Sequence, residues 1–157
     1  MRYTEGRVGR VFVVRLEHGD EIPSCIENFA AGKNVLHAQA IIVGGIGGGQ
    51  IVVGPRRSDV LPPDPMLIPV DGAHEVVGVG VIAPDATGRP VLHMHAALGR
   101  SGGTATGCVR PGVTTWMVGE VVLIELEGVQ ATRIMDAATG FALLEPGRQV
   151  TRSRKTS

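Results

Sequence analysis

The chain has 157 residues, of which 43% are hydrophobic, 19% are charged and only 3% are aromatic, and its 15 basic residues balance its 15 acidic ones. This length suits one domain, and the apolar content excludes a chain too polar to build a core. Since the sequence has neither an apolar run of about 18 residues nor a hydrophobic leader after Met1, we expect a cytoplasmic protein that does not span a membrane.

The first predicted elements are a strand over residues 8–16 and a short helix over residues 21–31. Apolar side chains recur at helical spacing through the second segment and form one stripe. Asp20 stands where a helix cap would, and Gly32 stands where a helix of this length would end. We therefore expect one amphipathic helix directly after the first strand.

The rest of the chain alternates between short runs rich in Val, Ile and Leu and turns rich in Gly and Pro, a pattern typical of strands. Further strands are predicted over residues 35–43, 50–54, 75–82, 91–98, 104–109, 118–126 and 131–135. Residues 55–65 contain four prolines and are expected to form a loop.

Three hairpins are expected among these strands. The glycine-rich segment 44–49 would turn the almost wholly apolar run 35–43, buried on both faces, back into the next strand. A second hairpin would turn around residues 100–103, and a third would pair the last two predicted strands. The fold class is α/β, and in detail α+β: a mostly antiparallel β-sheet with few helices.

The end of the chain differs in charge from the rest. Four of the 15 bases lie in residues 148–157, which hold no acid, so residues 1–147 carry 11 bases against 15 acids. We expect one domain over residues 1–147 and a flexible basic tail over residues 148–157. The mildly acidic domain lacks the basic surface that is usual for proteins that bind nucleic acid.

The strongest chemical signal is a pair of histidines on one predicted strand. His93 and His95 are two residues apart, so both imidazoles share a face of the sheet. If the hairpin turns evenly between Ser101 and Gly102, Cys108 lies opposite His95 and within reach of His93. Two imidazoles and a thiolate suit Zn²⁺, although the same residues on an inert polar face would give the same pattern.

These residues carry a resemblance to a known family. The segments 72–77, 88–99 and 107–109, with the turn 44–49, resemble the plant-and-prokaryote-conserved (PPC) domain over about residues 8–145. The resemblance implies a sheet-based α/β fold, a homotrimer and, as in several prokaryotic members, a metal held by three histidines. Cys108 stands where such members have the third histidine, and we expect it to remain a zinc ligand.

The resemblance leaves several functions open. PPC proteins are described as DNA-binding or regulatory modules, and the related fold of acetolactate decarboxylase holds catalytic zinc. A zinc-dependent lyase or hydrolase acting on a small molecule is therefore an alternative, with Glu75 as its acid or base, and a structural trimer with a degenerate site is another. DNA binding has little support from the charge of residues 1–147, and the tripeptide Gly88-Arg89-Pro90 has no basic flanks to make it a DNA-binding hook.

Overall fold

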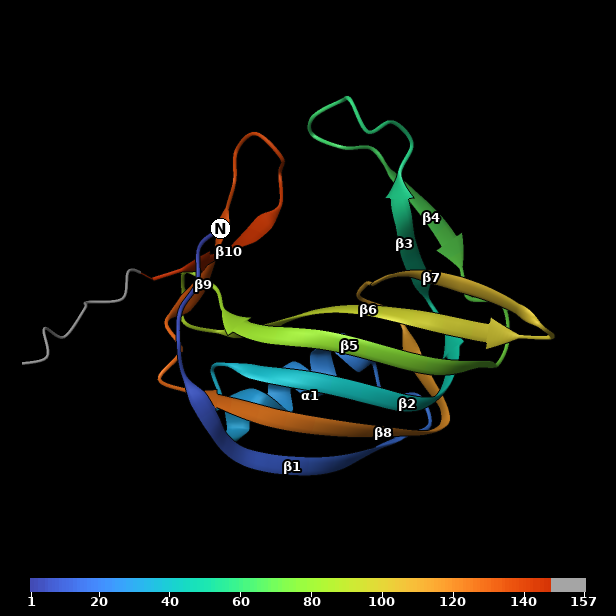
Figure 1. Cartoon of the computed structure of the whole chain (residues 1–157). Coiled ribbons are helices and arrows are strands. Elements are labelled where there is room, and N and C mark those ends of the chain that lie inside the picture. The colour runs from blue at the N-terminus through green and yellow to red at the C-terminus, as the bar shows by residue number, and fades with distance from the viewer. Residues whose placement is uncertain (148–157) are drawn as a thin grey trace, which may run out of the picture.

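The computed structural model describes residues 1–147 of the chain. Its elements are β1 (Arg7–Glu17), α1 (Ile22–Gly32), β2 (Ala38–Gly48), β3 (Gln50–Pro55), β4 (Pro65–Pro69), β5 (His74–Pro84), β6 (Pro90–Arg100), β7 (Gly103–Val109), β8 (Thr114–Glu127), β9 (Ala131–Met135) and β10 (Ala142–Pro146). Eight strands form one antiparallel sheet in the order β1-β8-β2-β5-β6-β7-β3-β4, and β9 pairs with β10 in a second, two-stranded sheet (Figure 1). The predicted fold class is confirmed.

Two of the predicted hairpins are wrong. Strand β3 pairs with β7 and β4 rather than with β2, because most of the glycine-rich segment stays extended and continues β2 as far as Gly48. Gly44 has a φ of +133° within the strand, and Gly49, with a φ of +99°, separates β2 from β3. Strand β8 pairs with β1 and β2, and its expected partner β9 pairs instead with β10, a strand that the sequence pattern did not predict.

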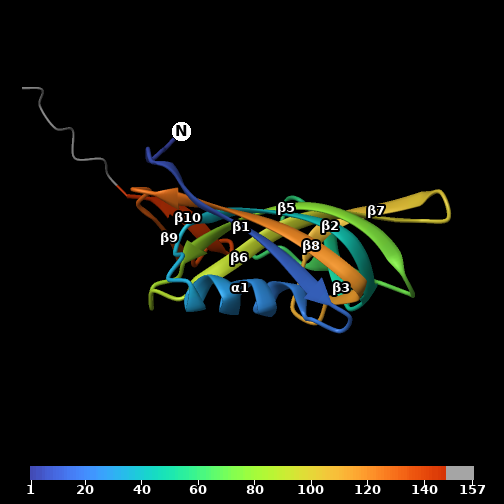
Figure 2. The ribbon, with the colours of Figure 1, turned by 90° about the horizontal axis from the view of Figure 1, so that it is seen from below.

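The helix α1 covers one face of the large sheet (Figure 2). Its apolar stripe buries Ile22, Ile26 and Ala30 against alternate residues of the strands, which confirms the predicted amphipathic helix. The predicted cap is wrong: Glu21 is the N-cap residue and makes no capping hydrogen bond, while the Asp20 carboxylate accepts a hydrogen bond from the backbone N–H of Glu17. The core therefore lies between α1 and this face.

The other face of the sheet is apolar and has no helix over it. It carries exposed valines, which we call the valine face: Val11, Val13, Val43, Val77, Val79 and Val81. Val43 belongs to β2, so the expectation that this strand is buried on both faces is wrong. Directly paired residues share a face of a sheet, and the pairs Val79–His95 and Val81–His93 place both histidines on the valine face.

Glycine in β2 has a packing role. A side chain at Gly45 would place its Cβ 2.5 Å from the carbonyl oxygen of Trp116 on β8, closer than real Cβ contacts. The backbone of β8 bends over the glycines here, as the register shifts between β2 and β8 near Ile46 indicate. The glycines thus allow the backbones of β2 and β8 to approach closely. No helix in residues 1–147 is long and apolar enough to cross a bilayer.

Candidate metal centre

The hairpin of β6 and β7 positions the predicted ligands. Its turn is made by Ser101 and Gly102, both with positive φ, which matches the two-residue turns that join tightly twisted strands. Arg100 then pairs with Gly103, and counting back along the strands sets His95 opposite Cys108. The register predicted from the sequence is the register of the structure.

The three side chains converge on one point of the valine face. One donor atom from each of His93, His95 and Cys108 lies within 4.8 Å of the other two. The two imidazole rings are nearly perpendicular, at 88°, with their centroids 5.0 Å apart. Both histidines are exposed, whereas Cys108 is only 8% exposed, so the cluster opens toward solvent from the side of the imidazoles.

The protonation of the cluster suits metal binding in part. Partial burial lowers the pKa of His93, and the neighbouring Arg133, His95 and Arg110 lower it further, which favours the neutral imidazole with a free lone pair. Burial raises the pKa of the Cys108 thiol, while Arg110 and Arg133 oppose that shift. A bound cation must therefore displace the thiol proton, which is ordinary behaviour for zinc sites. The donor set fits a zinc ion.

The comparisons with known proteins agree with this fold. The sequence pattern of the Plants and Prokaryotes Conserved (PCC) domain matches residues 3–127. The chain belongs to this family. The PPC resemblance drawn from the sequence is therefore confirmed, while no curated protein is similar enough in sequence to match the chain.

Solved structures with the same fold come from distant organisms. The PPC protein of Pyrococcus horikoshii is 25% identical, with a TM-score of 0.80, and the match covers 95% of this chain and 100% of that one. A metal-containing protein of Archaeoglobus fulgidus is 23% identical, also with a TM-score of 0.80, over 92% and 99% of the two chains. A proposed DNA-binding protein of Bacteroides thetaiotaomicron is 19% identical, with a TM-score of 0.73, over 93% and 99%.

Glu75, the predicted acid or base, lies on the same face of this PPC domain but away from the cluster. It pairs with Gly99, four positions along β5 from the residue opposite His95, which is about 13 Å at a rise of ~3.3 Å per residue. Within residues 1–147, the group of donors close enough to share one ion consists of the two histidines and Cys108. The chain by itself does not bring Glu75 to these ligands.

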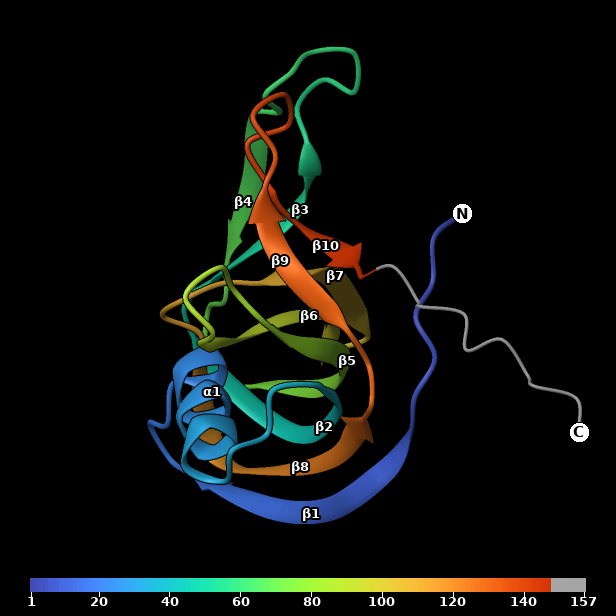
Figure 3. The ribbon, with the colours of Figure 1, turned by 90° about the vertical axis from the view of Figure 1, so that its left-hand side faces the viewer.

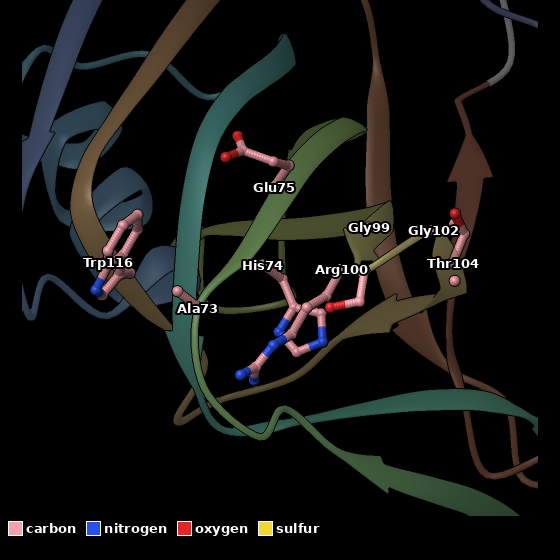
Figure 4. Close-up of a pocket in the computed structure, with 10 residues that line it drawn as sticks. Ala73, His74, Glu75, Gly99, Arg100, Gly102, Thr104 and Trp116 are labelled. Atoms are coloured by element: carbon pink, nitrogen blue, oxygen red, sulfur yellow. The ribbon is translucent and has the colours of Figure 1, made fainter.

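Glu75 instead lines an open pocket of about 520 Å³ at the far end of β5 and β6 (Figure 4). His74, Arg100 and Trp116 also border it. His74 Nδ1 bonds the carbonyl of Gly72, and the Arg100 guanidinium donates to the carbonyl of Asp71. These contacts orient the two side chains along the wall of the pocket. The pocket stays shallow, and both polar and apolar side chains line it.

The two remaining histidines also serve the backbone. His37 Nε2 lies 2.8 Å from the carbonyl oxygen of Ala131, and His18 Nδ1 accepts the N–H of Met117 at 3.2 Å. Both bonds tie strands or turns that are far apart in the sequence. Both side chains therefore have a structural role.

Arg133 is a site residue that the sequence analysis missed. It lies on β9, which crosses over the end of β5 (Figure 3), and it is only 7% exposed. Its guanidinium donates to the carbonyls of Val81 and Val91, at 2.9 and 3.3 Å, and burial lowers its pKa. A lone arginine within the strand pattern 131–135 was the available signal, but its burial depends on contacts with β5 and β6.

Proposed function

We propose that this PPC-domain protein binds zinc through His93, His95 and Cys108 and leaves one coordination position open to an external ligand. The observation that carries the proposal is the convergence of the three donor atoms within 4.8 Å of one another. Two imidazoles and one thiolate form a common zinc-binding set. Structural zinc usually has four protein ligands, so a site with three favours exchange of the fourth ligand.

Metal content tests the proposal directly. Purified wild-type protein, His93→Ala and Cys108→Ser are compared by inductively coupled plasma mass spectrometry, with His74→Ala as the matched control. His74 is an imidazole bonded to a backbone carbonyl outside the cluster. We expect about one zinc per chain in the wild type and the control, and little in the other two variants. A wild type that takes up no added zinc contradicts the proposal.

The open position allows a catalytic role as an alternative. A zinc ion there would supply a Lewis acid for a small oxygen-bearing molecule. Glu75 would act as acid or base only if another copy of the chain brought it to the site, since about 13 Å separates it from the position opposite His95, at ~3.3 Å per residue. We rank this alternative below metal binding itself.

DNA binding is the other candidate, and the similar protein of Bacteroides thetaiotaomicron is its main support. The charges of residues 1–147 favour it less. Six of the 11 bases form ion pairs with carboxylates: Arg2, Arg7, Arg10, Arg15, Arg56 and Arg57. Binding would then depend on the four bases of residues 148–157 and would weaken steeply with salt.

We also propose that the chain forms a homotrimer through the valine face. Val77 and Val79 are 56% and 51% exposed, although they lie in the middle of a sheet. A contiguous apolar area of this kind usually marks an interface. Three copies is the number that the family resemblance implies, and the metal site would then lie beside or within the contact between copies.

A further inference from the structure

Arg133 is a buried cation without a carboxylate partner. It is only 7% exposed, and none of the six ion pairs within residues 1–147 includes it. Buried charges in proteins are normally paired with an opposite charge, because removing them from water is costly. The two backbone carbonyls that Arg133 contacts are dipoles, and the Glu27 carboxylate acts on its charge without forming an ion pair with it.

The guanidinium lies beside the metal cluster. One of its acceptors, Val81, is directly paired with His93, and the other, Val91, stands two residues before His93 on the same strand. These bonds use Nε and Nη2. Within residues 1–147, Nη1 has no hydrogen-bond acceptor.

A second arginine stands on the other side of the cluster. Arg110 is exposed and follows Cys108 by two residues. Arg133 is held beside His93 by its bonds to the carbonyls of Val81 and Val91, so two arginines lie near the ligands. These arginines place positive charge on two sides of the cluster.

A bound divalent ion would leave an excess of positive charge at the site. The ligands supply one negative charge, from the thiolate of Cys108, against the two positive charges of the ion and those of the two arginines. An anion at the fourth coordination position would compensate this excess. A guanidinium recognises carboxylate and phosphate groups well, because its forked N–H donors match two oxygens.

We infer that the open position of the metal site binds a small oxyanion, a carboxylate or a phosphate, with one oxygen on the metal and another accepting the free N–H of Arg133. This inference rests on the zinc site proposed above. It assigns Arg133 a binding role, with Arg110 adding positive charge at the entrance. The natural ligand is then a small acid rather than a neutral molecule.

The test uses the protein loaded with Co²⁺, whose visible absorption reports changes in coordination. Sodium acetate and inorganic phosphate are titrated separately into wild type, Arg133→Gln and the control Arg100→Gln. Arg100 also donates to a backbone carbonyl, but at the hairpin turn away from the ligands. We expect a saturable spectral change in the wild type and the control, with affinity in Arg133→Gln on the order of 10-fold weaker or more.

The two probes identify the source of the oxyanion. A response to acetate at lower concentration supports a carboxylate ligand, and a response to phosphate at lower concentration supports a phosphate ligand. If Arg133→Gln fails to fold, Arg133→Lys replaces it, since lysine keeps the charge and loses the fork, and Arg110→Gln provides an exposed variant. Weaker anion binding in these variants supports the inference.

The failures of the two proposals are distinguishable. Co²⁺ bound by the wild type without any response to either anion, or with equal anion affinity in wild type and Arg133→Gln, overturns this inference and leaves the metal site intact. A wild type that binds neither Co²⁺ nor Zn²⁺ overturns both proposals.

Discussion

Cys108 is the residue at which this chain departs from the three-histidine set that the family resemblance implies. Its thiolate adds a negative charge that a third imidazole would lack. Its side chain is buried, and its backbone pairs with Val52 of β3. The pair of strands, rather than the identity of the side chain, sets where the third ligand lies, because position 108 is opposite His95.

This geometry gives a prediction for Cys108→His. The variant should retain about one zinc per chain, because three imidazoles are also an ordinary zinc-binding set. Its Co²⁺ form should lose the near-ultraviolet absorption that arises from a bond between cobalt and a thiolate. Metal analysis and absorption spectra of wild type and variant check both expectations. A wild-type Co²⁺ spectrum without that absorption would mean that Cys108 is not a ligand.

A second residue-scale prediction concerns acid stability. Arg10 on β1 bonds Glu125 on β8 at 2.7 Å, and this hydrogen bond lowers the pKa of Glu125 from 4.5 to about 2. A carboxylate with a lowered folded-state pKa stabilises the fold above pH 4.5, and the contribution is lost as pH falls from there toward 2. Because the pair reaches solvent, its contribution is about 1 kcal/mol or less.

Arg10→Gln should therefore reduce the loss of stability between pH 7 and pH 3. Urea unfolding of wild type and variant at both pH values measures the difference. Arg7→Gln is the matched control, since it removes the more exposed ion pair with Glu127 from the same two strands. The same pH-dependent loss in wild type and Arg10→Gln would count against the assignment.

At the scale of elements, the glycine between β2 and β3 matters for its close packing rather than for the hairpin turn expected of its segment. Gly49 has a φ of +99°, and a Cβ there would lie 2.5 Å from the carbonyl oxygen of Gly112. Gly49→Ala should lower the free energy of unfolding by about 2–4 kcal/mol, because backbone strain and a clash add together.

Gly88→Ala separates these two costs. Gly88 has a φ of +85° in the turn between β5 and β6, and no heavy atom lies within 4 Å of its added Cβ. It should lose only about 1–2 kcal/mol, the cost of a left-handed conformation. Urea unfolding of both variants gives the comparison. Equal losses would show that the contact between Gly49 and Gly112 is unimportant.

The hairpin of the metal site could be predicted because its register depends on local rules. Two turn residues with positive φ leave one pairing for His95, and the alternation of side chains then places all three ligands. The pairing of β3 with β7 and of β8 with β1 and β2 joins segments that are distant in the sequence, and no local pattern specifies it. Strand β4 was missed because Pro65 and Pro69 bound it, although an edge strand tolerates proline.

Arg133 shows the same limit at the site. Its strand was predicted, but its burial results from the crossing of β9 over β5, a contact between segments about 50 residues apart. A polar residue in a strand is usually solvated, so the pattern alone gave no reason to place this side chain beside His93. Residues that reach a site only through tertiary contacts cannot be predicted from local sequence patterns.

At the scale of the whole molecule, the valine face predicts self-association. Light scattering should give a mass about three times that of the 16.4 kDa chain, as the family resemblance implies. Val77→Glu should shift the mass toward one chain, because the charge would be buried in the contact.

Leu61→Glu is the control for this prediction. Leu61 is also an exposed apolar residue, but it lies in the loop between β3 and β4 and away from the face. The control should keep the wild-type mass. A wild type that scatters as a single chain at all concentrations would contradict the assembly.

The position of the ligands within one hairpin also bears on how metal affects folding. His93 and Cys108 are 15 residues apart, whereas the sheet is closed by pairs as distant as Arg7 and Glu127. Closing so short a segment costs little entropy, so an unfolded or partly synthesised chain can already chelate zinc. Because the unfolded state then competes for the ion, added zinc should raise the melting temperature by less than its affinity for the native protein implies.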